Sequence, residues 1–414
     1  MKLFQQMLVA GASLSLLTPI VAQASDVNLE EMNSYTRSTK SSKNRLDSKT
    51  FSKEIVKINE RVDNIESKFN EFEAGGFSDT TVLDGKAIFD VGSVDTDDDT
   101  YDGTTQFMYT YTLNLNTSFT GDDNLYTRIK TGNHTSWSKT KSVYNTYLSS
   151  GNGNGDVLEV DKLWYTTPVG DSNHTVTFGP KIENYYMHAT TPSIYQPVLK
   201  AFTLGGNAAG YGASTSPGVG WAYTADNGFA ISSNITSKNP VFTNEAAQSW
   251  ATQIGYTQPN YSVSALVNMK YNGWTDSYFM TTDGKARAGD GNSTNVGLRA
   301  WWRPTDAETA IPSISVGYDT SETDASSDSN TTAYFVGLNW TDVINADDKI
   351  GLAFGQPQMV EGETIEPFLY ELYYKYKVND SISVTPTIFG GTSKNASNVE
   401  TDMTGYLLQT TFKF

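Results

Sequence analysis

Residues 107–116 read FMYTYTLNLN, and apolar and polar side chains alternate almost throughout these ten positions. Because successive side chains of a β-strand point to opposite faces, this alternation predicts a strand with one apolar and one polar face. The pattern returns at 261–271, 368–377 and 406–414, where Tyr and Phe recur on the apolar face. A soluble sandwich could also bury such faces, but repeated aromatic ends of the apolar face are typical of an outer-membrane barrel with its aromatic girdles.

Alternating segments of this kind fill the chain from residue 77 to residue 414, and their number is about sixteen. They are joined by connections that are by turns short and long, the longest being 183–216. Short turns at one end and long loops at the other are typical of an all-β transmembrane barrel of antiparallel strands. An even strand number places both ends of the barrel segment on the periplasmic side. The predicted strands are 85–94, 104–120, 124–132, 156–168, 173–182, 217–225, 227–236, 249–257, 259–271, 293–303, 310–320, 331–341, 348–355, 365–377, 380–390 and 403–414.

The composition excludes several other classes of protein. The chain has no Cys, which excludes disulfides and thiolate metal sites, and it has no later apolar run long enough for a membrane-spanning helix. The formal net charge is −17, and from Phe77 onward 36 acidic residues face 19 basic ones. This excess argues against nucleic acid as a partner and favours an aqueous path that attracts cations.

The first 24 residues predict a secretory signal peptide. Lys2 precedes an apolar run at 7–21, which is followed by the cleavage pattern Ala22-Gln23-Ala24. A single membrane anchor is the alternative, but Pro19 and the shortness of the run disfavour it, since a spanning helix needs ~20 apolar residues. Residues 25–50 then form a basic linker arm, which is either a solvated tether or a contact with an anionic cell-wall polymer.

Residues 51–74 carry the clearest helical pattern of the chain. Apolar side chains spaced alternately four and three residues apart form a heptad seam, and Gly75-Gly76 ends it. Ile at both core positions favours trimers or tetramers, so we predict a trimeric coiled coil on the periplasmic side. The alternative is an amphipathic helix that packs on its own barrel. The seam consists of Phe51, Ile55, Ile58, Val62, Ile65, Phe69 and Phe72.

Several of these features together resemble one known family. The signal peptide, the coiled coil, the run from Gly75 to Thr81 that leads into Gly85-Lys86-Ala87-Ile88-Phe89, and the terminal Phe414 are similar to the cyanobacterial major outer-membrane porins. That family, labelled iron-uptake porins, is related to the OprB-like carbohydrate-selective porins. The resemblance implies a trimer of barrels that passes small inorganic ions. The family's usual S-layer-homology domain has no counterpart here, because only a short segment precedes the coiled coil.

We therefore expect a non-enzymatic, homotrimeric outer-membrane porin for passive diffusion of small hydrophilic solutes. Inorganic ions, including iron, are the first expectation; a sugar-selective pore and a structural barrel without an open pore are the alternatives. The segment 183–216 is the best candidate for a loop that folds inward, because its glycines allow the backbone to bend against the wall; an ordinary outward loop is the alternative. The terminal Phe412 and Phe414 are expected to signal barrel assembly. The pore candidates are Arg128, Lys130, Lys181, Glu183, His188, Lys200 and Arg299.

Metal, cofactor and catalytic sites are not expected. His134, His174 and His188 fall near opposite ends of the predicted barrel, so they cannot readily form a triad or a three-His metal site. Five Asp residues crowd the first long loop, at 95–102, without the spacing of a complete Ca²⁺ loop. A divalent-ion site is one interpretation of this cluster, and an acidic mouth that concentrates cations is the favoured one.

Overall fold

The computed structural model describes residues 80–414 apart from 142–143, 275–278, 282, 285–290, 306–310, 325–329 and 396. The chain divides into two units, Met1–Gly76 and Phe77–Phe414. The predicted signal peptide, basic arm and trimeric coiled coil, with Phe51, Ile55, Ile58, Val62, Ile65, Phe69 and Phe72, lie outside the described residues and stay predictions. No helix in the described part of the chain is long and apolar enough to cross a membrane.

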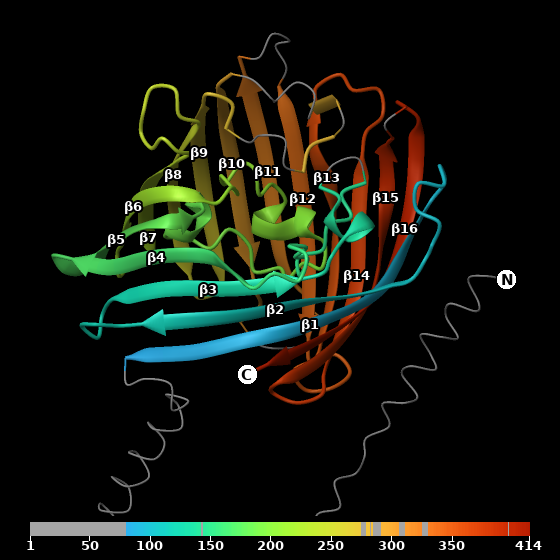
Figure 1. The fold of residues 1–414 in the computed structure, drawn as a ribbon, viewed down its shortest axis with the longest axis horizontal. Helices are drawn as coiled ribbons and strands as arrows, with labels where there is room; N and C mark the ends of the chain where they lie inside the picture. The colour runs from blue at the N-terminus through green and yellow to red at the C-terminus, as the bar shows by residue number, and fades with distance from the viewer. Residues whose placement is uncertain are drawn as a thin grey trace, which may run out of the picture. The chain divides into compact units, whose positions relative to one another are not determined.

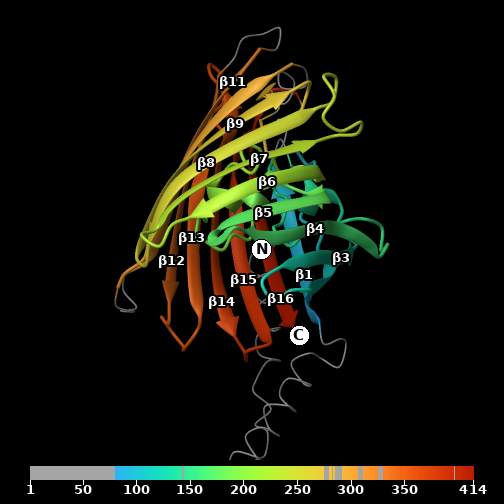
Figure 2. The ribbon, with the colours of Figure 1, turned by 90° about the vertical axis from the view of Figure 1, so that its left-hand side faces the viewer.

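The second unit is a closed barrel of sixteen strands, so the predicted fold class is confirmed. Every strand pairs antiparallel with its neighbours in the chain, and β1 closes the barrel by pairing with β16 (Figures 1 and 2). The strands are β1 Thr81–Thr96, β2 Gln106–Thr117, β3 Asn124–Gly132, β4 Glu159–Val169, β5 Asp171–Ile182, β6 Ser216–Thr224, β7 Phe229–Ser237, β8 Gln248–Gln258, β9 Tyr261–Tyr271, β10 Ser293–Trp302, β11 Ser313–Thr323, β12 Thr331–Thr341, β13 Lys349–Val360, β14 Phe368–Lys377, β15 Ile382–Lys394 and β16 Glu400–Lys413.

The period-two alternation decides which side chains point out of the barrel and which point in. Along β9, Val263 is 50% exposed while the neighbouring Ser262 is 1% exposed, and the same alternation runs along the strand. Apolar side chains thus cover the outer face, and small polar side chains cover the inner one. This is the reverse of a soluble barrel and is what a hydrocarbon surrounding requires.

The connections follow the expected order of the two ends, but their lengths do not alternate strictly. The turn 303–312 between β10 and β11 is longer than the loops 361–367 and 395–399 at the other end. The sequence prediction that short and long connections alternate is therefore wrong in this detail. The strands β13 and β15 run further toward the loop end than predicted, because their backbone pairing continues past the apolar band and shortens the loops there.

The seam between β1 and β16 is closed by the last residue of the chain. The amide of Gly85 donates to the carbonyl of Phe414 at 2.8 Å, and the amide of Phe414 donates to the carbonyl of Gly85 at 3.2 Å. The Phe414 ring lies over Gly85, where a Cβ atom would meet it at 2.7 Å, and it stacks on Tyr111. Phe412 packs on Phe89 on the same outer face, with 5.3 Å between ring centroids. An aromatic ring over a glycine pins the register of the closing strand pair.

Candidate channel lining

The connection 183–215 between β5 and β6, called the inner loop below, packs against the inner face of the barrel. Two short 3-10 turns, η2 at Asn184–Met187 and η3 at Lys200–Gly205, lie within it. Its apolar side chains form a core with inward residues of the wall, and all of the following are buried: Val198, Leu199, Phe202, Phe335, Tyr373 and Phe389. The loop therefore occupies part of the lumen as a packed element.

Glu371 on β14 holds the middle of the inner loop. Its carboxylate, 0% exposed, accepts hydrogen bonds from the Tyr195 hydroxyl at 2.8 Å and from the amides of Val198 at 3.0 Å and Leu199 at 2.6 Å. Buried charge is tolerated only where such donors satisfy it. Glu371 is thus an anchor of the loop, and it was not identified from the sequence, although the alternation of β14 placed it on the polar face.

Arg299 on β10 holds the end of η3. Its guanidinium donates from Nε to the Leu204 carbonyl at 2.7 Å and pairs through Nη2 with the Asp319 carboxylate at 2.9 Å. It also lies over the Tyr211 ring, 5.1 Å from the centroid. Arg299 faces the inner loop as predicted, but it is 3% exposed and its charge is paired. The inner loop covers this side chain, which the alternation alone would place in open lumen, so Arg299 is a buried anchor of the loop rather than an exposed pore residue.

A second loop, 133–158, pairs with the inner loop and is held to β1. The amide of Ser149 donates to the Val198 carbonyl at 2.7 Å, and the amide of Lys200 donates to the Tyr147 carbonyl at 2.7 Å. His134 and Ser150 both reach the same carboxylate oxygen of Asp90, at 3.0 and 2.7 Å.

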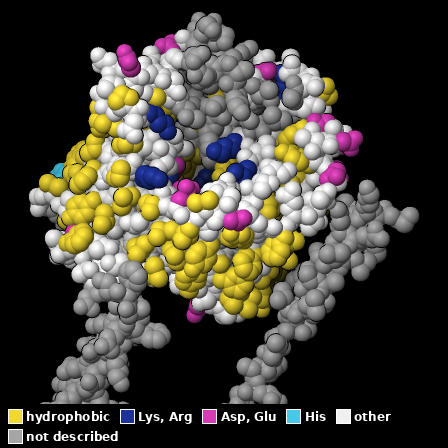
Figure 3. Space-filling model, in the orientation of Figure 1, with side chains coloured by type: hydrophobic (Ala, Val, Ile, Leu, Met, Phe, Trp, Pro, Cys, Tyr) yellow, Lys and Arg dark blue, Asp and Glu magenta, His cyan; other side chains and the backbone are white. Residues whose placement is uncertain are grey.

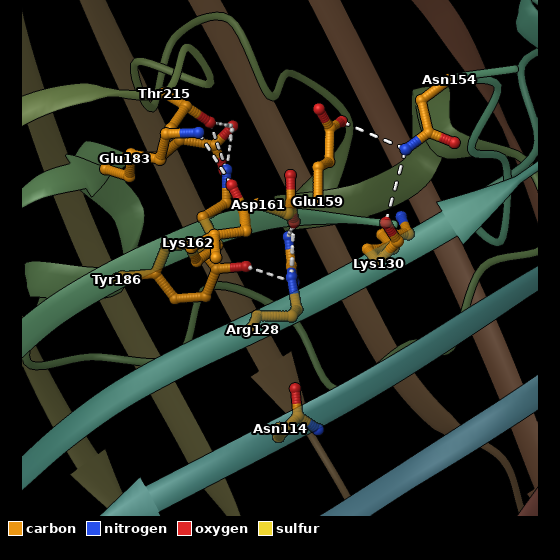
Figure 4. A network of polar contacts seen from close by, with 12 residues as sticks. Asn114, Arg128, Lys130, Asn154, Glu159, Asp161, Lys162, Glu183, Tyr186 and Thr215 are labelled. Atoms are coloured by element: carbon orange, nitrogen blue, oxygen red, sulfur yellow. Dashed lines mark hydrogen bonds and ion pairs between the residues drawn. The ribbon is translucent and has the colours of Figure 1, made fainter. Parts of the chain in front are cut away.

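The wall formed by β3 and β4 carries a network of charged and polar groups that faces the inner loop (Figure 4). Arg128 donates from Nε to the Asp161 carboxylate at 2.6 Å and from Nη1 to the Tyr186 hydroxyl at 3.2 Å. Lys162 is 3.3 Å from the Glu183 carboxylate and also bonds the Thr215 hydroxyl. A bulge brings Asp161 and Lys162 to the same face, because the β3–β4 register shifts between Arg128 and Ile129.

Aromatic rings lie beside this network. Tyr126 and Trp164 have ring centroids 4.4 Å apart, and Trp164 and Tyr186 have centroids 4.7 Å apart. Trp164 is 9% exposed, whereas Tyr126 and Tyr186 are half-buried. The network and these rings together present flat apolar surface next to fixed hydrogen-bonding groups.

Lys181 does not belong to this wall, and its prediction as a pore residue is wrong. It is exposed and pairs with Leu163, whose neighbours Lys162 and Trp164 point inward. Directly paired residues share a face, so Lys181 lies on the outside. The reason is an irregularity in β5, where the register with β6 shifts between Gly179 and Ile182 and reverses the alternation.

The remaining pore candidates lie inside the barrel in different environments. Lys130 is on the inner face of β3, opposite Glu159, and Lys200 is half-buried at the start of η3. Burial would raise the pKa of Glu183, but the positive charges of Lys162 and Lys200 outweigh burial and lower it. His188 packs beside Ser232 at 3.1 Å, and burial lowers its pKa to about 3, so its ring is neutral near pH 7.

At least one carboxylate of the acidic first loop forms hydrogen bonds within the protein and so is not free to bind solute. Asp98 accepts hydrogen bonds from the Tyr144 hydroxyl at 2.5 Å and from the Asn395 amide at 3.2 Å, which ties three loops together. Among the described residues, no group of three or more His, Asp or Glu is placed to hold a metal ion. The three histidines lie apart: His174 accepts from the Trp221 indole at 3.1 Å, whereas His134 and His188 each bond different groups inside the barrel.

Comparison with known proteins assigns the family. Residues 48–414 match the model of the carbohydrate-selective porin, OprB family. An uncharacterised protein of Nostoc sp. is 26% identical over 408 residues, which cover 88% of this chain and 70% of that protein. The family model and this cyanobacterial relative together confirm the resemblance stated above.

Solved structures share the fold at low sequence identity. OprB of Pseudomonas putida is 13% identical, with a TM-score of 0.58 over 82% of this chain and 97% of that chain. The in-vitro-folded trimer form of OmpT, an outer-membrane protein of Vibrio cholerae, is 14% identical, with a TM-score of 0.51 over 81% of this chain and 99% of that chain. The protein is thus an outer-membrane porin for small solutes, and it belongs to the OprB family of carbohydrate-selective porins.

Proposed function

We propose that sugars are the principal solutes that diffuse through this porin. The family points to this class, which the sequence offered only as the alternative to inorganic ions. The expectation of inorganic ions and iron has weaker support, because the matched family is described as carbohydrate-selective.

One observation carries the proposal: aromatic rings stand next to a fixed charged pair on the lumen wall. Tyr126 and Tyr186 offer ring faces, and Arg128 and Asp161 offer donors and acceptors that their ion pair holds in place. A sugar has the matching chemistry, with apolar C–H faces and a rim of hydroxyl groups. Apolar and aromatic walls with a few well-placed polar groups are the usual form of small-molecule sites.

The test is the rate at which liposomes that contain the purified protein swell in neutral sugars of increasing size. We expect uptake of monosaccharides and disaccharides, with rates several-fold lower for Trp164→Ala, which removes the ring between Tyr126 and Tyr186. Trp302→Leu is the matched control, because Trp302 is on the same kind of strand but 40% exposed on the outer face. Conductance without sugar uptake would contradict the proposal, and silence in both assays would support the structural-barrel alternative.

We further propose that the protein is a homotrimer whose protomers associate through residues 51–72 and through the barrels. The heptad seam supports this proposal, as does the trimer form described for OmpT. Three heptads are marginal as an isolated coiled coil, so the barrels must contribute contacts. The mass in mild detergent should correspond to three protomers, and Ile58→Asp combined with Ile65→Asp should reduce it. A monomeric native mass would refute the trimer.

A further inference from the structure

Four lysines stand in two directly opposed pairs near the end of the barrel that carries the short turns. Lys86 on β1 is the cross-strand partner of Lys413 on β16, and Lys349 on β13 is the partner of Lys375 on β14. Like charges directly opposite each other destabilise a sheet. Both Lys–Lys pairs therefore destabilise the sheet, and a function of these lysines would explain their presence. These residues are called the lysine quartet below.

All four side chains point into the lumen, as the alternation along each strand shows. Lys86 shares its face with the buried Ile88 and Asp90, and Lys375 shares its face with the buried Glu371 and Tyr373. Lys413 is on the face of Gln409, which bonds Asp90 inside the barrel at 2.9 Å. Lys349 is in register with Lys375 and follows the same alternation as the buried Gly351 and Ala353.

The lysine quartet is unpaired within the part of the chain that the structure describes. None of its ammonium groups has a carboxylate within ion-pair distance there, whereas Lys377, two residues beyond Lys375, is 2.8 Å from both Asp347 and Asp380. The negative charges of Asp342 and Asp347 act on Lys349 from the neighbouring turn. Two residues before Lys86, Asp84 is hydrogen-bonded to the amides of Asn114 and Asn116.

The quartet acts as one electrostatic unit that continues into the channel. Lys375 is repelled by the charges of Lys413, Lys349 and Lys86, and Lys86 is repelled in turn by Arg128. Four inward carboxylates are matched by cations or a histidine, namely Asp90 with His134, Asp161 with Arg128, Glu183 with Lys162, and Asp319 with Arg299. The lysine quartet thus adds four positive charges to a lumen in which these four carboxylates are matched and Glu371 and Asp84 are bonded by neutral donors, although the chain as a whole carries −17.

The surface view agrees with this distribution. In Figure 3, most visible Lys and Arg side chains gather in and around the hollow, and most visible Asp and Glu side chains lie toward the edges. Charges on the wall of a narrow passage outweigh charges at the rim, because low-dielectric walls focus their field and salt screens the rim over ~10 Å at 0.1 M.

We infer that the lysine quartet makes this channel prefer anions, so that sugars carrying a carboxylate or phosphate group pass faster than neutral sugars of the same size. This inference rests on the proposed function, since it requires a lumen open to sugars. It reverses the cation preference that net charge and the acidic first loop indicate. The lysine quartet raises the local anion concentration at the short-turn end. Arg128 on β3 extends this positive charge toward the aromatic rings of Tyr126, Trp164 and Tyr186.

The first test measures the reversal potential of single channels across a KCl gradient at low ionic strength. The wild type should favour Cl⁻, and the fourfold variant with Lys86, Lys349, Lys375 and Lys413 each changed to Gln should reduce the permeability ratio at least about threefold. The matched control is Lys377→Gln, because that charge is already paired. A cation preference of the wild type, or an unchanged ratio in the fourfold variant, would overturn the inference.

A second test compares glucose with gluconate uptake into liposomes and separates the inference from the proposed function. The fourfold variant should lose the advantage of gluconate and keep the glucose rate, which also shows that it folds. If it does not fold, Lys375→Gln and Lys413→Gln singly should each lower the gluconate rate in part, and no change in either would overturn the inference. Chloride preference in a channel that excludes both glucose and gluconate would refute the sugar proposal, whereas glucose uptake without an advantage for gluconate would overturn the inference alone.

Discussion

Glu371 and Lys375 lie on the same inner face of β14, four residues apart, and differ in almost everything else. Glu371 is fully buried under the inner loop and is bonded to it by three donors, whereas Lys375 faces Lys349 without a counter-charge among the described residues. The covered wall, which includes Glu371 and Arg299, uses charge to hold the loop. The open wall, which includes the lysine quartet and the partly exposed Arg128–Asp161 pair, presents charge to the solute. An inward charged residue of a porin can therefore have either role, and burial and pairing distinguish the two.

The largest effect should follow from removing the anchor of the covered wall. Glu371→Ala leaves the Val198 and Leu199 amides and the Tyr195 hydroxyl without their acceptor, at about 1–3 kcal/mol for each donor that stays buried. We expect the inner loop to detach from the β14 wall and the single-channel conductance to rise at least about twofold. The heat-induced unfolding midpoint should also fall. Glu366→Ala, in the exposed loop before β14, is the control. Unchanged conductance would mean that the loop is held by apolar packing alone.

The next effect separates stability from selectivity on the covered wall. Arg299→Leu leaves the Asp319 carboxylate buried without its cation, which destabilises by about 3–5 kcal/mol. We expect a lower unfolding midpoint in detergent and an unchanged reversal potential in the fraction that folds. Replacing both residues, with Arg299→Met and Asp319→Leu, should recover much of the stability. A shift in reversal potential comparable to that of the lysine quartet variant would show that Arg299 does face the solute.

A smaller effect should follow when a paired charge on the open wall is made unpaired. Asp161→Asn removes the carboxylate that Arg128 holds at 2.6 Å and leaves the guanidinium facing the lumen. We expect the preference for Cl⁻ over K⁺ to rise about twofold, because one more wall charge is free to act on the solute. Asp156→Asn is the control, since that carboxylate bonds the exposed Tyr109 hydroxyl outside the network. An unchanged preference would place Asp161 outside the path of the ions, and a reduced preference would contradict the role given to Arg128.

The smallest effect concerns pH. The pKa of His188 falls to about 3 in the folded chain, so the unfolded chain binds more protons at every pH between that value and the ordinary pKa of 6.5. The contribution of His188 to stability is complete above pH 6.5 and declines as the pH falls toward 3. The unfolding midpoint should therefore drop less between pH 7.5 and pH 5 in His188→Gln than in the wild type. His174→Gln, which changes a histidine bonded to Trp221 outside the lumen, should not reproduce this difference.

The sequence by itself determined the barrel, because the direction of a strand's side chains is a local, period-two property. All sixteen predicted segments correspond to strands, and two of them, 124–132 and 331–341, have the observed bounds. The alternation also placed Lys375, Lys413 and Glu371 on the polar faces of their strands.

Only the tertiary structure decided what those inward residues do. The irregularity in β5 turned Lys181 outward, since one shift of register reverses a face. The inner loop covered Arg299 and Glu371, while strands far apart in the chain brought Lys86 opposite Lys413. Local pattern sets the direction of a side chain, but its burial and its charged neighbours depend on segments that meet only when the barrel closes.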